Sequence, residues 1–198
     1  MAIIVVGGSS RGVGKTALVC GLIAALSEYR WSAVKITTDV HSKPKPIWEE
    51  TSAGKGTDTA RYLAAGAERA FLATAAMSMR ERRLEPDLPP VLDELWPNFG
   101  PGTNLIFESN SILRHLQPTL CLLVQGAADD ATRKPSFTAA LGLADALVVH
   151  APLNRFIPDG FCRVGEQPKP IFSLAAVEQI SQEMLFWLRD RLHGRALL

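Results

Sequence analysis

A glycine-rich turn, residues 7–16, follows the first apolar segment of the chain and carries residue types that suit phosphate binding. Its glycines allow the backbone to fold tightly enough for several N–H groups to point at one anion, and a following helix adds its positive end. At this spacing Lys15 would reach the β- and γ-phosphates, and the Thr16 hydroxyl would ligate a bridging Mg²⁺ ion. The nucleotide-binding residues that we predict are Ser10, Arg11, Gly12, Val13, Gly14, Lys15, Thr16 and Ala17.

The glycine-rich turn departs at one position from the usual phosphate-binding pattern. That pattern places a glycine six residues before the lysine, where this chain has Ser9, and the glycines stand earlier, at Gly7 and Gly8. The alternative interpretation is a tight strand-to-helix turn without a ligand. Phosphate binding is favoured, because the Gly-Lys-Thr sequence follows a predicted strand and opens a predicted helix.

Two acidic residues follow predicted strands and are candidates for metal binding. Glu108 comes directly after an apolar strand, at the edge where ligands of open α/β folds collect. There it could hold Mg²⁺ through water or orient an attacking nucleophile, and the alternative is a solvated carboxylate. Asp39 follows the second strand in the same way. The predicted metal site therefore comprises Thr16, Asp39 and Glu108.

Lys35 is a charged residue inside a predicted buried strand, so it needs a partner. It either points toward the site beside Lys15 or forms a structural ion pair. Arg11, within the turn, could stabilise charge on a transferring phosphoryl group or face solvent. The predicted catalytic residues are Lys15, Lys35 and Glu108.

The elements that would position these residues alternate between strands and helices. Short apolar or β-branched runs predict strands at residues 2–6, 32–37, 70–74, 104–107, 120–124 and 146–149. Helices are predicted at residues 17–26, 57–65, 88–96, 111–116 and 137–143, and a last helix is capped by Ser173 and carries an apolar stripe as far as Leu192. Residues 38–56 predict a long exposed loop. This order predicts an α/β fold of the P-loop NTPase type, with a mainly parallel sheet covered by helices on both faces.

Composition limits the classes of function that fit the chain. With 198 residues and 47% hydrophobic content we expect a single nucleotide-binding domain over residues 1–198. The 21 basic and 20 acidic residues are nearly balanced, which argues against nucleic-acid or membrane-surface partners. We also expect no leader and no membrane-spanning segment. Three widely spaced cysteines favour a reducing, cytoplasmic location.

Four segments together resemble the molybdopterin-guanine dinucleotide biosynthesis B proteins. They are residues 5–16, the strand end at residues 34–37, the Gly-Thr-Asp-Thr-Ala-Arg segment that continues to Ala67, and Ile106-Phe107-Glu108. The resemblance implies a GTP-linked accessory role in molybdenum-cofactor biosynthesis, and it implies functional roles for Gly12, Gly14, Lys15, Thr16 and Glu108. The family has a glycine after the acidic residue, where this chain has Ser109.

The wider class that includes dethiobiotin synthetase is similar too, with a lysine near the end of the second strand and an acidic residue ending a later one. Lys35 and Glu108 would occupy those places. Three hypotheses therefore stand: an accessory nucleoside triphosphatase with low turnover of its own, an ATP-dependent small-molecule ligase or kinase, and a nucleotide-dependent switch whose residues 38–56 order around the γ-phosphate.

The identity of the nucleotide and of any partner stays open at this point. The guanine-reading Asn-Lys-x-Asp sequence does not occur, so both ATP and GTP are candidates. The second ligand would be a small-molecule substrate or a partner protein of cofactor biosynthesis. Residues 96–99 and the last helix are candidate surfaces for a homodimer.

Overall fold

The computed structural model describes residues 1–39, 45–54, 56–80, 83–126, 134–150, 161–164, 167–174 and 179–195. Within this part of the chain a nine-stranded sheet has the order β10-β11-β9-β8-β1-β7-β2-β4-β3. The strands are β1 (Ile3–Gly8), β2 (Ser32–Thr37), β3 (Ile47–Glu50), β4 (Arg69–Thr74), β7 (Leu105–Glu108), β8 (Leu120–Gln125), β9 (Ala146–His150), β10 (Phe161–Val164) and β11 (Gln167–Leu174).

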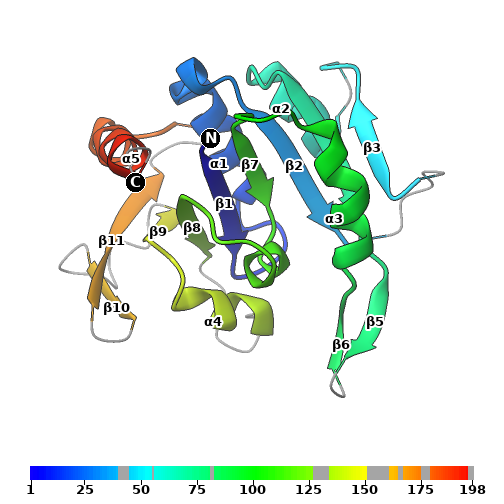
Figure 1. Cartoon of the computed structure of the whole chain (residues 1–198). Helices are drawn as coiled ribbons and strands as arrows, with labels where there is room; N and C mark the ends of the chain where they lie inside the picture. Colours follow the sequence, from blue (N-terminus) through cyan, green and yellow to red (C-terminus); the bar gives the residue numbers. More distant parts are fainter. Residues whose placement is uncertain are drawn as a thin grey trace.

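Neighbouring strands from β11 to β4 run parallel, and only the edge strands β3 and β10 pair antiparallel to their neighbours. The predicted first strand lies in the middle of this sheet, between β7 and β8. All carboxyl ends of the parallel strands therefore meet at one edge, which is where the glycine-rich turn begins (Figure 1).

Helices cover both faces of the sheet (Figure 1). One face packs against α1 (Lys15–Ala25), α2 (Asp58–Ala64) and α5 (Gln182–Arg195), and the other against α3 (Pro89–Leu95) and α4 (Pro135–Leu141). Along β1 the buried side chains alternate, so that Ile4 and Val6 belong to the first core and Val5 to the second. The predicted fold class is confirmed.

The end of the chain differs from the prediction. Residues up to Leu174 form strand β11, and α5 begins only at Gln182, so Ser173 does not cap a helix. Phe172 and Leu174 are buried, with the half-buried Ser173 between them, which is the period of a strand and not of a helix. The helical stripe is confirmed where the helix exists, because Met184, Leu188 and Leu192 are buried.

The connection after β2 also differs from the prediction of one long loop. Residues 40–44 and Lys55 lie outside the described residues, and residues 47–50 form β3, which pairs antiparallel with β4. Further on, β5 (Met77–Arg80) and β6 (Arg83–Pro86) form a separate hairpin beyond the carboxyl edge of the main sheet (Figure 1).

Three short 3-10 helices complete the described chain: η1 (Ser27–Tyr29), η2 (Trp96–Asn98) and η3 (Ser111–Arg114). The last of these takes the place of the helix predicted at residues 111–116. No helix among the described residues has the length and apolar character needed to cross a membrane.

Candidate functional site

The glycine-rich turn connects β1 to α1 in a shape that glycine makes accessible. Gly12 and Gly14 have φ angles of 73° and 99°, in the left-handed region that L side chains rarely adopt. Gly14 is also the N-cap of α1, and no side chain caps this end of the helix. The first-turn N–H groups of α1 are thus left for another acceptor, as in an anion-binding helix start.

The displaced glycines of this turn have a steric explanation. A Cβ atom on Gly7 would lie 2.4 Å from Asn110 Oδ1, and one on Gly8 would lie 2.7 Å from Val13 Cγ1 and 2.8 Å from Lys15 Cγ. The position where glycine is usual is tolerant instead, because the Ser9 hydroxyl accepts a hydrogen bond from Gly126 N–H at 3.1 Å. Glycine is therefore required at positions 7 and 8, where neighbouring side chains leave no room for a Cβ atom, and a serine is accommodated at position 9.

Asn110 holds the start of this turn from the end of β7. Its side-chain oxygen accepts a hydrogen bond from Gly8 N–H at 2.7 Å, and its amide donates to the Gly8 carbonyl at 3.0 Å. The same amide donates to Ser136 Oγ at 3.1 Å, at the start of α4. One side chain thus ties together three segments that surround the turn.

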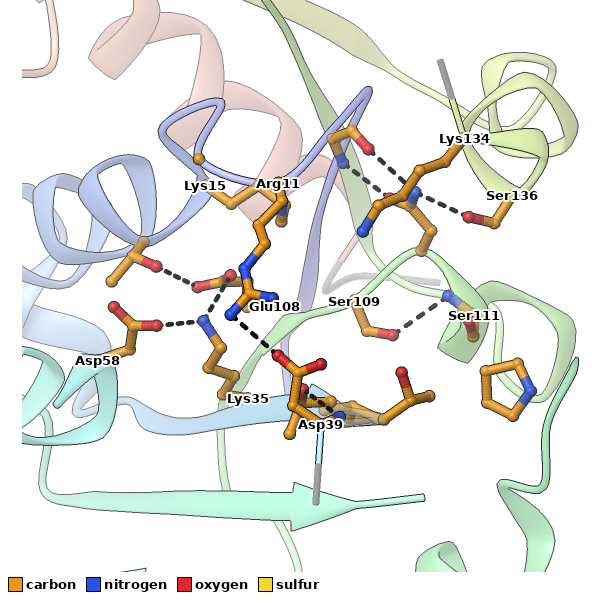
Figure 2. Close-up of a pocket in the computed structure, with 18 of the residues that line it drawn as sticks. Arg11, Lys15, Lys35, Asp39, Asp58, Glu108, Ser109, Ser111, Lys134 and Ser136 are labelled. Atoms are coloured by element: carbon orange, nitrogen blue, oxygen red, sulfur yellow. Dashed lines mark hydrogen bonds and ion pairs between the residues drawn. The ribbon is translucent and has the colours of Figure 1, made fainter. Parts of the chain in front are cut away.

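Glu108 is the centre of a group that we call the Glu108 cluster, which comprises Thr16, Lys35, Asp58, Tyr62 and Glu108. Figure 2 shows Lys35 between Asp58 and Glu108. The Glu108 side chain is only 4% exposed. It accepts hydrogen bonds from Thr16 Oγ1 at 2.8 Å, from Lys35 Nζ at 3.2 Å and from the Tyr62 hydroxyl. The structure therefore places the predicted Lys35, Thr16 and Glu108 in direct contact.

Strand register explains how Lys35 and Glu108 meet. The two residues are direct partners in the pairing of β2 with β7, so both leave the sheet at the same level. Lys35 Nζ also donates to Asp58 Oδ2, at the start of α2. The ammonium group is thus shared between two carboxylates.

The charges in the cluster are mutually stabilised. Burial lowers the pKa of Lys35, but Glu108 and the Asp58 hydrogen bond raise it by more, so that this pKa lies above its ordinary value. Burial raises the pKa of Asp58, and the hydrogen bond and charge of Lys35 overcome that effect and hold it below its ordinary value. Burial, with Glu108 second, places the pKa of the Tyr62 hydroxyl well above its ordinary value, so Tyr62 stays a neutral donor.

Lys15 has a different electrostatic environment. Its Nζ donates to the Ser10 carbonyl at 2.9 Å, within the glycine-rich turn. Burial lowers the pKa of Lys15, the charge of Glu108 opposes this shift, and the cations Lys134 and Lys35 add to it. The charged form of a half-buried ammonium with other cations nearby is stabilised when an anion binds next to it.

Arg11, in the glycine-rich turn, and Asp39, beyond the end of β2, form an exposed ion pair. Arg11 Nη2 is 3.1 Å from Asp39 Oδ2, and these side chains are 84% and 49% exposed. The carboxylate of Asp39 thus pairs with the turn (Figure 2), while the Glu108 carboxylate contacts Thr16. The metal role of Asp39 stays a prediction.

These residues line one cleft of about 1380 Å³ at the carboxyl edge of the sheet. The lining includes most of the predicted nucleotide-binding residues, while Val13 is buried beneath the turn against Gly8 and Gly126 and Ser10 contributes its carbonyl to Lys15. On the far side the cleft reaches the β5–β6 hairpin through Met77, Glu85 and Pro86. A volume above the usual 300 to 1,000 Å³ of ligand pockets leaves room for more than one ligand.

The donor atoms at the Glu108 cluster fit a magnesium ion. A hydroxyl from Thr16 and a carboxylate from Glu108 are the hard oxygen ligands that Mg²⁺ takes. Among the described residues no group of three or more His, Cys, Asp or Glu side chains is arranged to hold a metal ion. Mg²⁺ usually binds through one or two carboxylates together with phosphates and water.

Sequence reasoning missed several members of the site. Asp58 and Tyr62 stand four residues apart on α2, which places both on one helix face, and this spacing was a usable signal. Asn110 stands two residues after Glu108, but its grip on Gly8 depends on the pairing of β7 with β1. Lys134 lines the cleft from the start of α4, and its sequence context carries no such signal.

The mainly parallel sheet, the helices on both faces and the glycine-rich turn between β1 and α1 define a fold of the P-loop NTPase type. Among solved structures, the "apo" form of LpxK from Aquifex aeolicus, in complex with ATP, matches with a TM-score of 0.52 and 20% sequence identity. The match covers 87% of this chain and 53% of that one, so this chain spans about half the length of LpxK. No protein-family model and no curated protein matches the sequence.

Proposed function

We propose that this protein binds a nucleoside triphosphate with Mg²⁺ in the cleft and hydrolyses or transfers its terminal phosphoryl group. One observation carries the proposal: Glu108, buried at the end of β7, is hydrogen-bonded both to Thr16, which follows the glycine-rich turn's lysine, and to Lys35. A buried acid linked to the first turn of α1 can orient a nucleophile beside a phosphate bound at that turn.

Each residue then has a defined role. Backbone N–H groups of the glycine-rich turn and the Lys15 ammonium bind the phosphates. Thr16 and Glu108 would hold Mg²⁺, which neutralises phosphate charge when bound. Lys35, kept charged by Glu108 and Asp58, lies beside Glu108 and would orient oxygens of the transferred group.

A thermal-shift titration with ATP and GTP, each with and without Mg²⁺, tests this proposal. A ligand at about 100 times its dissociation constant stabilises by about 2.7 kcal/mol. For a chain of this size each kcal/mol raises the melting temperature by about 2 to 4 °C. The ATP bound to LpxK supports ATP, and the resemblance described above supports GTP. No stabilisation by either nucleotide would overturn the proposal.

For the biological role we propose an accessory factor of molybdenum-cofactor biosynthesis. The segment that carries the resemblance also builds the site, because it supplies Asp58 and Tyr62 to the Glu108 cluster. Titration with molybdopterin in the presence of GTP and Mg²⁺ should show binding, together with slow nucleotide turnover by the protein alone. A failure to bind the pterin with either nucleotide would contradict this role.

A second candidate, an ATP-dependent ligase or kinase, is favoured by the length of the cleft. Beyond Lys35 the cleft continues to Met77, Glu85 and Pro86 on the β5–β6 hairpin, where a small acceptor would fit beside the terminal phosphate. The measurement is ATP hydrolysis in the presence of a panel of small carboxylates, amines and alcohols. If the protein is a ligase or kinase, at least one of these compounds should accelerate ATP hydrolysis. If it is an accessory factor, none of them should.

A further inference from the structure

Most cations of the cleft face a carboxylate. Each of these pairs has a nitrogen-to-oxygen contact within 4 Å: Arg11 with Asp39, Lys35 with Asp58 and Glu108, Arg61 with Asp58, and Arg114 with Glu85. Lys15 and Lys134 differ, since neither forms an ion pair with any carboxylate of the described chain. The unpaired positive charge in this part of the cleft thus comes from two lysines.

The backbone of Lys134 is fixed to the glycine-rich turn. Its N–H donates to the Ser9 carbonyl at 2.9 Å, and Ser9 N–H in turn donates to the Val124 carbonyl at 2.9 Å. Two residues later, Ser136 Oγ accepts from the Asn110 amide, which also holds Gly8. Lys134 therefore starts from a well-defined position next to the turn (Figure 2).

The side chains of Lys134 and Lys15 line the same part of the cleft, and their charges interact. Both line the cleft, and the charge of Lys134 lowers the pKa of Lys15 more than the charge of Lys35 does. Two neighbouring cations of which neither has a carboxylate partner repel each other until an anion lies between them. A polyphosphate chain bound at the turn is an anion of suitable charge and place.

We propose that Lys134 is a second phosphate-contacting residue, which holds the phosphate chain of the nucleotide from the α4 side while Lys15 holds it from the α1 side. This inference rests on the proposed nucleotide binding and adds a residue to it from the half of the chain that lies beyond the resemblance. It assigns Lys134 to ligand binding and not to folding, since the link to Ser9 is made by its backbone N–H.

The test is the affinity for Mg-ATP and for inorganic triphosphate, a probe with phosphates alone, in wild type and in Lys134→Ala, Lys134→Gln and Lys134→Arg. We expect the Ala and Gln variants to bind both ligands about tenfold or more weakly than wild type, because a charge-assisted contact is lost. The Arg variant should keep an affinity within about threefold of wild type. Arg191→Ala, which removes an exposed cation of α5 outside the cleft lining, is the control and should bind as wild type does.

The melting temperatures without ligand should be equal for all these variants. If Lys134→Ala and Lys134→Gln both bind inorganic triphosphate within twofold of wild type, the inference is wrong, although nucleotide binding stands. If wild type itself binds neither ligand, the proposed function fails instead. If the Ala variant is unstable, the Gln variant decides by the same criterion, because it keeps most of the aliphatic stem and a polar end while it removes the charge.

Discussion

Glu108 is the last residue of β7 and Asp39 lies two residues beyond the end of β2, and these two acids lie in different environments. Glu108 is 4% exposed and accepts hydrogen bonds from Thr16, Lys35 and Tyr62. Asp39 is 49% exposed, and its carboxylate pairs with Arg11, whose side chain is 84% exposed. A position at or just beyond the end of a strand therefore does not decide the environment of an acid.

The difference comes from the elements that converge on each strand end. β7 lies between β1 and β2, so the end of β7 receives Thr16 from the start of α1 and Lys35 from its neighbour, while α2 adds Tyr62. Asp39 lies beyond β2, where its partner comes from an exposed turn. Buried charged contacts are screened little by salt, whereas an exposed ion pair contributes about 0 to 1 kcal/mol to the free energy of unfolding.

The largest effect tests whether the cleft binds phosphate at all. Lys15→Ala should reduce binding of the nucleoside triphosphate by about 2 to 5 kcal/mol, because the half-buried Lys15 ammonium lies beside the turn and would face the phosphates. Isothermal titration calorimetry measures the affinity, and the melting temperature without ligand should stay close to that of wild type. Wild-type affinity in this variant would remove the basis for comparing the two acids as parts of a nucleotide site.

The next effect separates the two acids by chemistry. Glu108→Gln should lower the single-turnover rate of nucleotide hydrolysis about 100-fold or more, since a neutral amide cannot act as base or metal ligand, while triphosphate affinity changes less. Glu85→Gln is the control, a carboxylate of the same cleft that pairs with Arg114 on the hairpin side. Equal rates for Glu108→Gln and wild type would show that the buried acid has no catalytic part.

Sequence patterns predicted the central sheet because its strands are continuous apolar runs. Residues 32–37 and 120–124, for example, are buried or half-buried between helices, and such runs leave few alternatives to a parallel strand. They did not predict β3 or the β5–β6 hairpin, which are short and made of mixed polar and apolar residues, so pairing with a neighbour and not composition defines them.

Some members of the candidate site were predictable from the sequence, but the other members and the contacts between them were not. Lys35 and Glu108 were identified separately, yet their contact depends on β2 and β7 being neighbours in register, with Lys35 opposite Glu108. The order of strands in a sheet is a long-range property, and a single sequence contains little information about it. Asn110 escaped attention for the same reason, since its grip on Gly8 crosses from β7 to β1.

A substitution with a smaller expected effect tests whether the Glu108 cluster depends on the ion pair between Asp58 and Lys35. Asp58→Asn should destabilise the protein by about 1 to 3 kcal/mol near neutral pH, because it removes the charged acceptor of Lys35. The pKa of Asp58 in the fold lies below its ordinary value of 3.8, so the stability it contributes is full above that value and is lost as pH falls through the lowered pKa.

Thermal unfolding of wild type and Asp58→Asn between pH 7 and pH 3 provides the measurement. The difference between their melting temperatures should shrink toward pH 3. The Lys35→Met substitution removes the ammonium that pairs with Asp58. In that background, Asp58→Asn should change the melting temperature little at any pH between 7 and 3. A difference that stays constant with pH would show that Asp58 acts through packing alone.

The smallest effect completes the comparison at the exposed acid. Asp39→Asn should change the free energy of unfolding by less than about 1 kcal/mol, because an exposed ion pair is screened by water and salt. The melting temperature should then move by no more than about 4 °C. Hydrolysis measured against Mg²⁺ concentration gives the functional side, and we expect at most a few-fold shift in the Mg²⁺ requirement, compared with a large loss for Glu108→Gln. If the two substitutions raised the Mg²⁺ requirement equally, the acids would share the metal role that their positions after strands predicted, and burial would not be what distinguishes them.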